Sequence, residues 1–270
     1  MTDRFPSLPV LMFHSIGDGA SAAFRRWQVP PALFADQLAC LGAAGYRLLS
    51  LSEALSRPVE KNVAITFDDA FADFSTHAVP ALRKANAGAT LYVPTAYVGG
   101  RATWLSAYPE GASPLLAWSD LRDLHSAGYE IGSHSHRHAE LDLLNSHELR
   151  HDVETSRRLL EDELRCRTQS FCYPFGYHTR TVRKVVADAG FTSACEVGYR
   201  IHHRDASPFS VSRLIVTGST SPEQTLALVR NGQPGITPYL RRGGRTPWRA
   251  FRAARHGLGI PRPPARREKP

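Results

Sequence analysis

Two adjacent carboxylates, Asp68 and Asp69, stand directly after the apolar segment Asn62–Phe67 (NVAITF). The β-branched and apolar residues of this segment are typical of a buried strand. In α/β proteins active sites assemble at the carboxyl ends of strands, where one acid can bind a metal ion while the other accepts a proton. A helix cap or a solvated turn is the simpler interpretation when the pair is considered alone.

Three histidines, His134, His136 and His138, follow a second predicted strand, Tyr129–Ser133. Neutral imidazole together with carboxylate suits Zn²⁺, Co²⁺, Ni²⁺ or Fe²⁺, and two histidines with one aspartate leave coordination positions open for water and substrate. A polar loop explains alternating histidines when they are considered alone. Two such clusters, each at the end of a strand, favour an open and therefore catalytic metal site.

Predicted strands and helices alternate along most of the chain. We predict strands at Val10–Phe13, Tyr46–Leu51, Asn62–Phe67, Thr90–Val93, Tyr129–Ser133, Ser170–Tyr173, Phe191–Cys195 and Ser210–Val216. We predict helices at Ala32–Ala43, Val79–Ala87, Trp118–Ala127, Ser146–Arg165, Thr179–Ala189 and Pro222–Val229. This rhythm of about eight strands predicts a (β/α) barrel or a near relative of one.

Three motifs occur in one order: TFDD at Thr66–Asp69, HSxxH at His134–His138 and FxYPFG at Phe171–Gly176. From about Pro9 to Thr217 the chain resembles the polysaccharide deacetylase family, carbohydrate esterase family 4. The resemblance implies a distorted, incomplete (β/α) barrel of about seven or eight parallel strands. It also implies the metal-dependent removal of acetyl groups from N-acetylated sugars.

Carried over to this sequence, the resemblance makes Asp68 the general base. It makes Asp69, His134 and His138 the ligands of one divalent metal ion, zinc first, with cobalt, nickel and iron as alternatives. The backbone N–H of Phe175 would stabilise the oxyanion of the tetrahedral intermediate. These roles suit the chemistry, because an ion that acidifies water needs a carboxylate nearby to take the proton.

The motif residues Tyr173 and Pro174 are assigned to substrate binding on the same resemblance. The long segment Thr95–Leu116, rich in Gly, Pro and Ala, contributes Trp104 and Tyr108. Aromatic faces suit the apolar faces of pyranose rings, so these two residues could form a wall on which a sugar stacks. They could equally anchor the loop.

The sequence departs from the family pattern in two places. Cys172 stands where many members carry an arginine that pairs with the base, and the late Leu-x-His motif that supplies the general acid is absent. Arg213, in a late predicted strand, could approach the base instead. In a subgroup acting on exopolysaccharide glucosamine, an early histidine after a strand protonates the leaving amine, and here this is His14; a capping role for His14 is the alternative.

The positive charge of the chain is concentrated in its last residues. The net charge is +8, and residues 231–270 hold ten basic residues and one acid, so the remainder carries −1. We therefore divide the chain into a catalytic barrel, 1–230, and a basic, Arg/Pro-rich tail, 231–270. No nucleic-acid partner is expected for the near-neutral barrel.

Within the tail, Thr246–Gly257 has the pattern of a helix with an N-cap and an N1 proline. One face of this helix is apolar and arginines surround it; the apolar residues are Trp248, Phe251, Ala254 and Leu258. The pattern suits peripheral contact with an anionic membrane through residues 241–270. A disordered tail and a helix docked on the barrel are the alternatives.

We expect a cytoplasmic protein, peripheral at the inner face of the membrane if the tail binds lipid. No stretch approaches the length of a spanning helix, Met1–Pro9 has no apolar run, and the four cysteines are scattered. The function predicted is a metal-dependent N-deacetylase of N-acetylhexosamine units in an oligo- or polysaccharide or its lipid-linked precursor. A hydrolase of a small amide or formamide, and a non-catalytic glycan-binding assembly protein, remain the alternatives.

Overall fold

The computed structural model describes residues 7–57, 59–203, 205–234 and 245–258. At the centre of this part of the chain lies one sheet of nine parallel strands. The strands are β1 (Val10–Phe13), β4 (Arg47–Leu49), β5 (Asn62–Phe67), β6 (Thr90–Val93), β7 (Glu130–Ser133), β8 (Ser170–Cys172), β9 (Ser193–Glu196), β10 (Val211–Ser212) and β11 (Leu214–Ile215). Two further short strands, β2 (Ser15–Ile16) and β3 (Gln28–Val29), pair separately.

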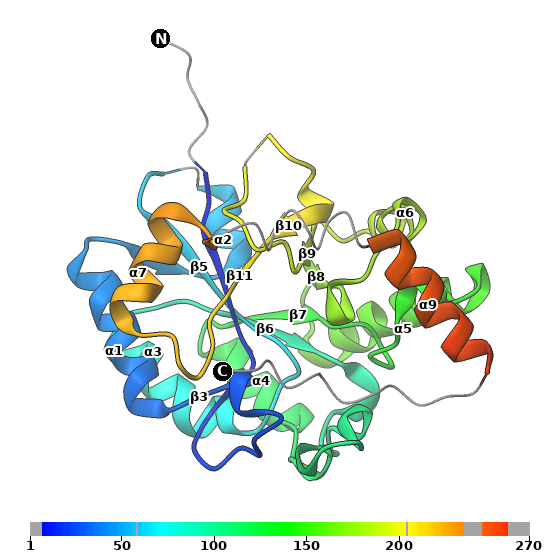
Figure 1. The fold of residues 1–270 in the computed structure, drawn as a ribbon, viewed down its shortest axis with the longest axis horizontal. Coiled ribbons are helices and arrows are strands. Elements are labelled where there is room, and N and C mark those ends of the chain that lie inside the picture. The colour runs from blue at the N-terminus through cyan, green and yellow to red at the C-terminus, as the bar shows by residue number, and fades with distance from the viewer. Residues whose placement is uncertain (1–6, 58, 204, 235–244, 259–270) are drawn as a thin grey trace.

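The sheet curls until its two ends meet in consecutive residues of the chain. Its strand order is β10-β9-β8-β7-β6-β5-β1-β11, with β4 also paired to β5. Arg213 alone separates β10, which pairs with β9, from β11, which pairs with β1. The predicted single strand Ser210–Val216 is therefore wrong in being continuous, whereas the predicted distorted, incomplete (β/α) barrel is confirmed (Figure 1).

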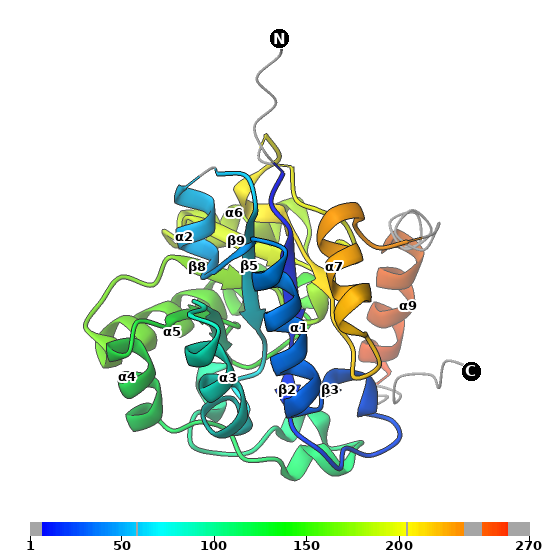
Figure 2. The same ribbon diagram turned by 90° about the vertical axis from the view of Figure 1, so that its left-hand side faces the viewer.

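Helices cover the outside of the barrel. They are α1 (Pro31–Ala43), α2 (Leu51–Ser56), α3 (Val79–Lys84), α4 (Trp118–Ser126), α5 (Ser146–Leu164), α6 (Arg180–Asp188), α7 (Pro222–Asn231) and α9 (Arg245–Gly257). Figure 2 shows α1 with α3 and α7 on either side of it, and the contacts α1 makes with both agree. No helix in the described ranges combines the length and apolar character needed to span a bilayer.

Local sequence explains where several helices begin. Asn145 caps α5, accepting from the backbone N–H of Glu148, while the Glu148 side chain accepts from the Asn145 N–H. The predicted strand Tyr46–Leu51 is wrong at its end, because Ser50 accepts from the Glu53 N–H and starts helix α2. A serine followed three residues later by glutamate is the sequence signal that this prediction overlooked.

An aromatic cluster fixes the carboxyl ends of β1 and β5. The rings of Phe13 and Phe67 stack with centroids 5.3 Å apart, and Phe34 of α1 meets both edge-on at 5.1 and 5.7 Å. All three side chains are fully buried, and burying a phenylalanine contributes roughly 1.5–3 kcal/mol. The residues that come directly after these strands, His14 and Asp68, are therefore held on a rigid base.

Candidate active site

The residues singled out from the sequence gather at one edge of the barrel. His14 follows β1, Asp68 and Asp69 follow β5, and His134 follows β7. The turn that contains Phe175 follows β8. Because every strand pair of the barrel is parallel, these carboxyl ends meet on the same side.

Asp69, His134 and His138 form a compact set of potential metal ligands. One ligand atom from each lies within 4.8 Å of the others, and all three residues are buried. The Asp69 Oδ1 atom is 3.2 Å from His138 Nε2 and 3.6 Å from His134 Nε2. The described residues add no fourth ligand to this set, and one carboxylate with two imidazoles fits an open catalytic site for zinc or a similar ion.

The surrounding backbone orients these side chains. The Nδ1 atom of His134 lies 2.9 Å from the Cys172 carbonyl oxygen, which as an acceptor leaves Nε2 directed at Asp69. Asp69 and His138 both adopt left-handed backbone conformations, with φ of 76° and 51°. Such strain in non-glycine residues persists only where the structure holds it and is concentrated at functional sites.

The chemistry of Asp69 matches a bound cation. Its buried Oδ1 atom accepts no hydrogen bond from the described residues. Burial raises the pKa of Asp69 and lowers the pKa of His134. A divalent cation would compensate a buried anionic carboxylate, and it binds the neutral imidazole that burial favours.

A second group of potential ligands, Asp68, His134 and Cys172, is less suitable. Both Asp68 oxygens accept hydrogen bonds from the Arg213 guanidinium, at 2.6 and 2.7 Å. Burial raises the pKa of the Cys172 thiol, so the thiolate that a metal requires is disfavoured. The set built on Asp69 is therefore the better metal site.

Arg213 is fully buried and forms a bidentate ion pair with Asp68. Its position between β10 and β11 allows the side chain to reach across the barrel from the seam. Burial by itself raises the pKa of Asp68, but the charge of Arg213 and its hydrogen bonds outweigh this and hold the pKa well below its ordinary value. Asp68 is therefore ionised at neutral pH and can accept a proton.

Cys172 leaves room for this arrangement. Its sulfur lies 3.0 Å from Arg213 Nη2 and 3.6 Å from Asp68 Oδ1. The guanidinium that pairs with Asp68 thus comes from the seam of the barrel, while a small residue occupies the position on β8.

His14 lies close enough to both carboxylates for their charges to act on its imidazole. Burial lowers the pKa of His14, and the charges of Asp68 and Asp69 oppose that shift. Its ring packs against Trp27 at a centroid distance of 4.7 Å. Its Nδ1 atom is buried and has no hydrogen-bond partner among the described residues, so this nitrogen is not committed to the scaffold.

Phe175 and Trp104 enclose His138 from two sides. The Trp104 ring stacks on the His138 ring at 4.7 Å and 25°, and the Phe175 ring meets it edge-on at 4.6 Å. Trp104 also contacts Tyr97 at 4.8 Å, so it both anchors its loop and borders the site. Phe175 has φ 59° and ψ 3°, a left-handed conformation that sets the direction of its backbone N–H.

Tyr173 and Pro174, which the resemblance assigns to substrate binding, both lie in the protein interior. Tyr173 is fully buried and donates its hydroxyl to the Phe209 carbonyl oxygen, and Pro174 is also buried. Their side chains pack in the protein interior, so their contribution is to shape the turn before Phe175.

His136 does not join the metal-ligand set, although it lies between two members in sequence. Its Nδ1 atom is 2.9 Å from the Thr95 hydroxyl, and its backbone N–H donates to Asp152. In an extended segment alternate side chains would share a face, but left-handed Ser135 and His138 break that pattern.

The motifs and this geometry agree with a known family. A family model described as polysaccharide deacetylase matches residues 56–194, just over half of the chain. The chain belongs to the polysaccharide deacetylase family. Deacetylation by this family is hydrolysis of an amide bond.

Individual relatives extend the match beyond that region. YxkH of Bacillus subtilis (strain 168), whose name assigns it to the polysaccharide deacetylases, is 26% identical over 226 residues, covering 82% of this chain and 75% of YxkH. The Streptococcus pyogenes deacetylase PplD, solved in complex with acetate, is 25% identical with a TM-score of 0.72, covering 83% of this chain and 98% of PplD. IcaB from Ammonifex degensii shares the fold at 23% identity and a TM-score of 0.67, covering 83% of this chain and 97% of IcaB.

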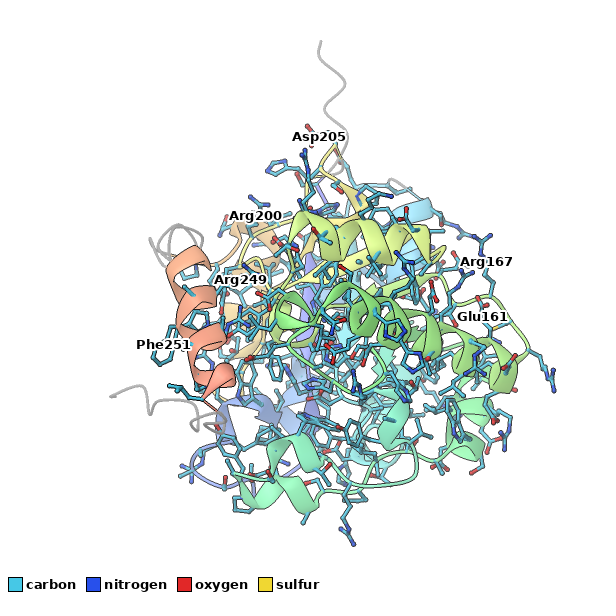
Figure 3. All side chains as sticks on the ribbon, turned by 90° about the vertical axis from the view of Figure 1, so that its right-hand side faces the viewer. Glu161, Arg167, Arg200, Asp205, Arg249 and Phe251 are labelled. Carbon is cyan, nitrogen blue, oxygen red and sulfur yellow. The ribbon has the colours of Figure 1, made fainter. Side chains whose placement is uncertain are left out.

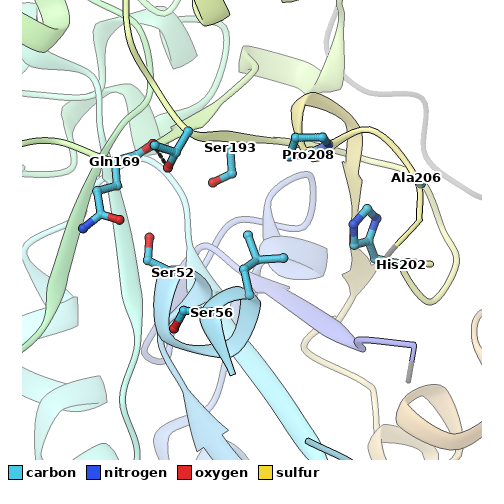
Figure 4. Close-up of a pocket in the computed structure, with 9 residues that line it drawn as sticks. Ser52, Ser56, Gln169, Ser193, His202, Ala206 and Pro208 are labelled. Carbon is cyan, nitrogen blue, oxygen red and sulfur yellow. Dashed lines mark hydrogen bonds between the residues drawn. The ribbon is translucent and has the colours of Figure 1, made fainter. Parts of the chain in front are cut away.

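The pocket drawn in Figure 4 lies away from the candidate active site. It has a volume of about 430 Å³ and is lined by Ser52, Gln169, Ser193 and His202, among others. Gln169 and Ser193 stand at the amino ends of β8 and β9, the opposite end of the sheet from the catalytic motifs. This pocket therefore does not indicate which reaction the protein catalyses.

Sequence reasoning assigned no role to a buried pair next to the Phe175 turn. His178 Nε2 lies 2.6 Å from Glu196 Oε2, and both side chains are almost completely buried. Arg183 Nη1 contacts His178 Nδ1 at 3.1 Å, and Arg213 Nε donates to the Glu196 carbonyl oxygen. The pair joins the Phe175 turn to β9, a connection that no local pattern indicated.

Proposed function

We propose that this protein is a metal-dependent N-deacetylase that removes acetyl groups from N-acetylhexosamine units of a glycan. The observation that carries the proposal is the buried cluster of Asp69, His134 and His138 beside the Asp68–Arg213 ion pair. The Asp69 carboxylate accepts no hydrogen bond at Oδ1 from the described residues, and two imidazoles face it. This set suits one divalent ion, zinc first.

A bound ion would polarise the acetamide carbonyl and acidify a water molecule. Asp68 accepts the proton of the attacking water, and Arg213 keeps that carboxylate ionised and fixed in orientation. The backbone N–H of Phe175 donates to the oxyanion as the carbonyl carbon becomes tetrahedral.

His14 donates a proton to the leaving nitrogen. Expulsion of an amine is slow unless the nitrogen gains a proton, so an acid must lie within reach of the reaction centre. The proposal for His14 is supported by its electrostatic coupling to both carboxylates and by the uncommitted Nδ1 atom. Trp104 borders the site and supplies an aromatic face for a sugar ring.

The test is release of acetate from a panel of N-acetylated oligosaccharides by the metal-loaded protein, with Asp68→Asn as the matched inactive control. The proposal is supported if the wild type releases acetate from hexosamine oligomers and the Asp68→Asn control does not. Turnover of small amides or formamides alone favours another hydrolase of this fold. No turnover by protein that binds metal stoichiometrically favours a glycan-binding assembly protein.

A lipid-linked glycan as substrate, a cytoplasmic location and contact of residues 241–270 with anionic membrane stay proposals. The support for membrane contact is the exposed face of α9, where Trp248, Phe251 and Leu258 are 45%, 55% and 74% exposed. Sedimentation with anionic vesicles tests it: Phe251→Ser should reduce binding by the full chain, and equal binding by both forms would exclude this face.

A further inference from the structure

The C-terminal helix α9 is attached to the barrel by buried ion pairs. Arg252 is 2% exposed, and its guanidinium forms two hydrogen bonds with the Asp142 carboxylate, at 3.0 and 2.6 Å. Arg249 donates twice to the Asp142 carbonyl oxygen, and Arg255 lies 3.5 Å from Glu140 Oε2. These arginines face the protein, and Figure 3 shows Phe251 on the outer side of the helix.

The acids that hold α9 belong to the loop of a proposed metal ligand. Glu140 and Asp142 follow His138 by two and four residues. The side chains of both acids are nearly buried, with exposed fractions of 12% and 4%. Removing Arg252 would leave two buried carboxylates without their main counter-charge, and the segment would have to move for water to reach them.

The same arginine also contacts the turn that carries the proposed oxyanion donor. Its guanidinium lies over the Tyr177 ring, 3.7 Å from the centroid. Trp248, one turn earlier on α9, donates its indole N–H to the Tyr177 hydroxyl at 2.8 Å. Tyr177 is two residues after Phe175, and their rings are 5.9 Å apart.

Both attached segments contain a strained residue. His138 and Phe175 adopt left-handed conformations and their rings touch at 4.6 Å. Neither residue is a glycine, so each conformation has to be held by its surroundings. One helix that binds the segments following both residues is placed to do this.

We propose that α9 is a clamp that sets the position of His138 relative to the Phe175 backbone N–H, with Arg252 as its main positioning residue. The clamp joins two loops that the barrel presents on separate strands, β7 and β8. Its catalytic consequence rests on the proposed function, whereas its effect on the two loops does not.

The experiment compares Arg252→Met with wild type and with Arg158→Met, which removes an exposed arginine of α5. Hydrogen exchange of the metal-free full chain should be faster at residues 138–144 and 174–178 in Arg252→Met only. With an N-acetylated oligosaccharide, kcat should fall about 10²-fold while KM changes little, because a misplaced oxyanion donor weakens the transition state more than substrate binding. Arg252→Lys should restore part of the protection from exchange and part of kcat, because lysine keeps the positive charge but cannot form the bidentate pair.

Unchanged exchange in both loops, or an unchanged kcat, would overturn the clamp. If Arg252→Met does not fold, Trp248→Phe removes the indole N–H that donates to the Tyr177 hydroxyl and keeps an aromatic ring beside Phe251. That variant should speed exchange at residues 174–178 and lower kcat by a few-fold; wild-type values for both would contradict the proposal. If the wild type deacetylates nothing, the proposed function fails, and the exchange measurement still decides on the clamp.

Discussion

At the amino end of the sheet, the Glu130 carboxylate of β7 accepts hydrogen bonds from the Ser52 N–H and hydroxyl and from the hydroxyls of Thr90 and Ser170, at 2.6–3.0 Å. At the carboxyl edge, Asp69 Oδ1 is buried and accepts no hydrogen bond from the described residues, although two imidazole nitrogens face it. Satisfied buried networks stabilise a fold, whereas an unsatisfied group in a native site indicates a missing partner or a catalytic role. We call the first the structural end of the sheet and the second, which carries the proposed catalytic groups, its reactive end.

Removing the proposed proton-transfer groups of the reactive end should have the largest effect on this contrast. Asp68→Asn and His14→Ala should each lower kcat by on the order of 10²–10⁴, the usual span for a general base or acid, with metal and fold retained. The two losses should not multiply, because both residues serve one proton-transfer cycle. Steady-state kinetics measures kcat, metal analysis measures the bound ion, and circular dichroism checks the fold.

If His14→Ala turns over within a few-fold of wild type, the acid is another group. Asp68 is then the next candidate, since His136 is bonded to the Thr95 hydroxyl rather than directed at the metal ligands.

A substitution at the structural end should lower the stability of the fold and leave kcat unchanged. Glu130→Ala leaves three side-chain hydroxyls and one backbone N–H without their acceptor, so the free energy of unfolding should fall by about 2–4 kcal/mol. kcat should stay within two-fold of wild type. Urea denaturation measures the free energy of unfolding, with Glu163→Ala, a partly exposed glutamate of α5, as control. A large loss of kcat at full stability would mean that the two ends are not separate.

Asp73 offers a smaller test of the reactive end. Its Oδ1 is buried without a donor from the described residues, while Oδ2 accepts from Ser15 at 2.5 Å. Burial raises the pKa of Asp73 to about 6 from 3.8, against the opposing hydrogen bond from Ser15. Because the folded state has the higher pKa, ionisation destabilises it, and the cost appears as pH rises from about 4 to about 6.

Asp73→Asn removes that cost. Relative to wild type, the variant should therefore gain at most about 3 kcal/mol of unfolding free energy between pH 4 and pH 7. Urea unfolding of both proteins at the two pH values provides the measurement. A stability difference that does not change with pH would show that Asp73 titrates normally.

Local patterns predicted much of the fold and indicated that acids and histidines gather at the carboxyl ends of strands, whereas the choice of Asp69, His134 and His138 among them came from the family resemblance. The bounds of β5 and β6 agree with the sequence predictions. The structure also brings Asp69, His134 and His138 together, and their role as metal ligands stays a prediction. The break at Arg213 was not predicted, because a buried guanidinium within a strand depends on a carboxylate 145 residues away.

Docking of α9 on the barrel was one of the alternatives that the sequence left open, but the face by which it docks was not predicted. Its helical pattern was recognised, but the apolar residues of that pattern turned out to be the exposed ones. Arg252 is buried instead, because its partner Asp142 lies 110 residues earlier in the chain. Periodicity identifies a helix and cannot identify the surface on which an ion pair holds it.

Metal titration of the His-x-His-x-His segment tests the central claim most directly. Calorimetry with Zn²⁺ should give one site in wild type and in His136→Ala, and the site should be lost in His134→Ala and His138→Ala, since losing one of three ligands destroys it. His136 is the matched control because it shares the loop but bonds to Thr95. Stoichiometric zinc in His138→Ala with normal release of acetate would contradict the account.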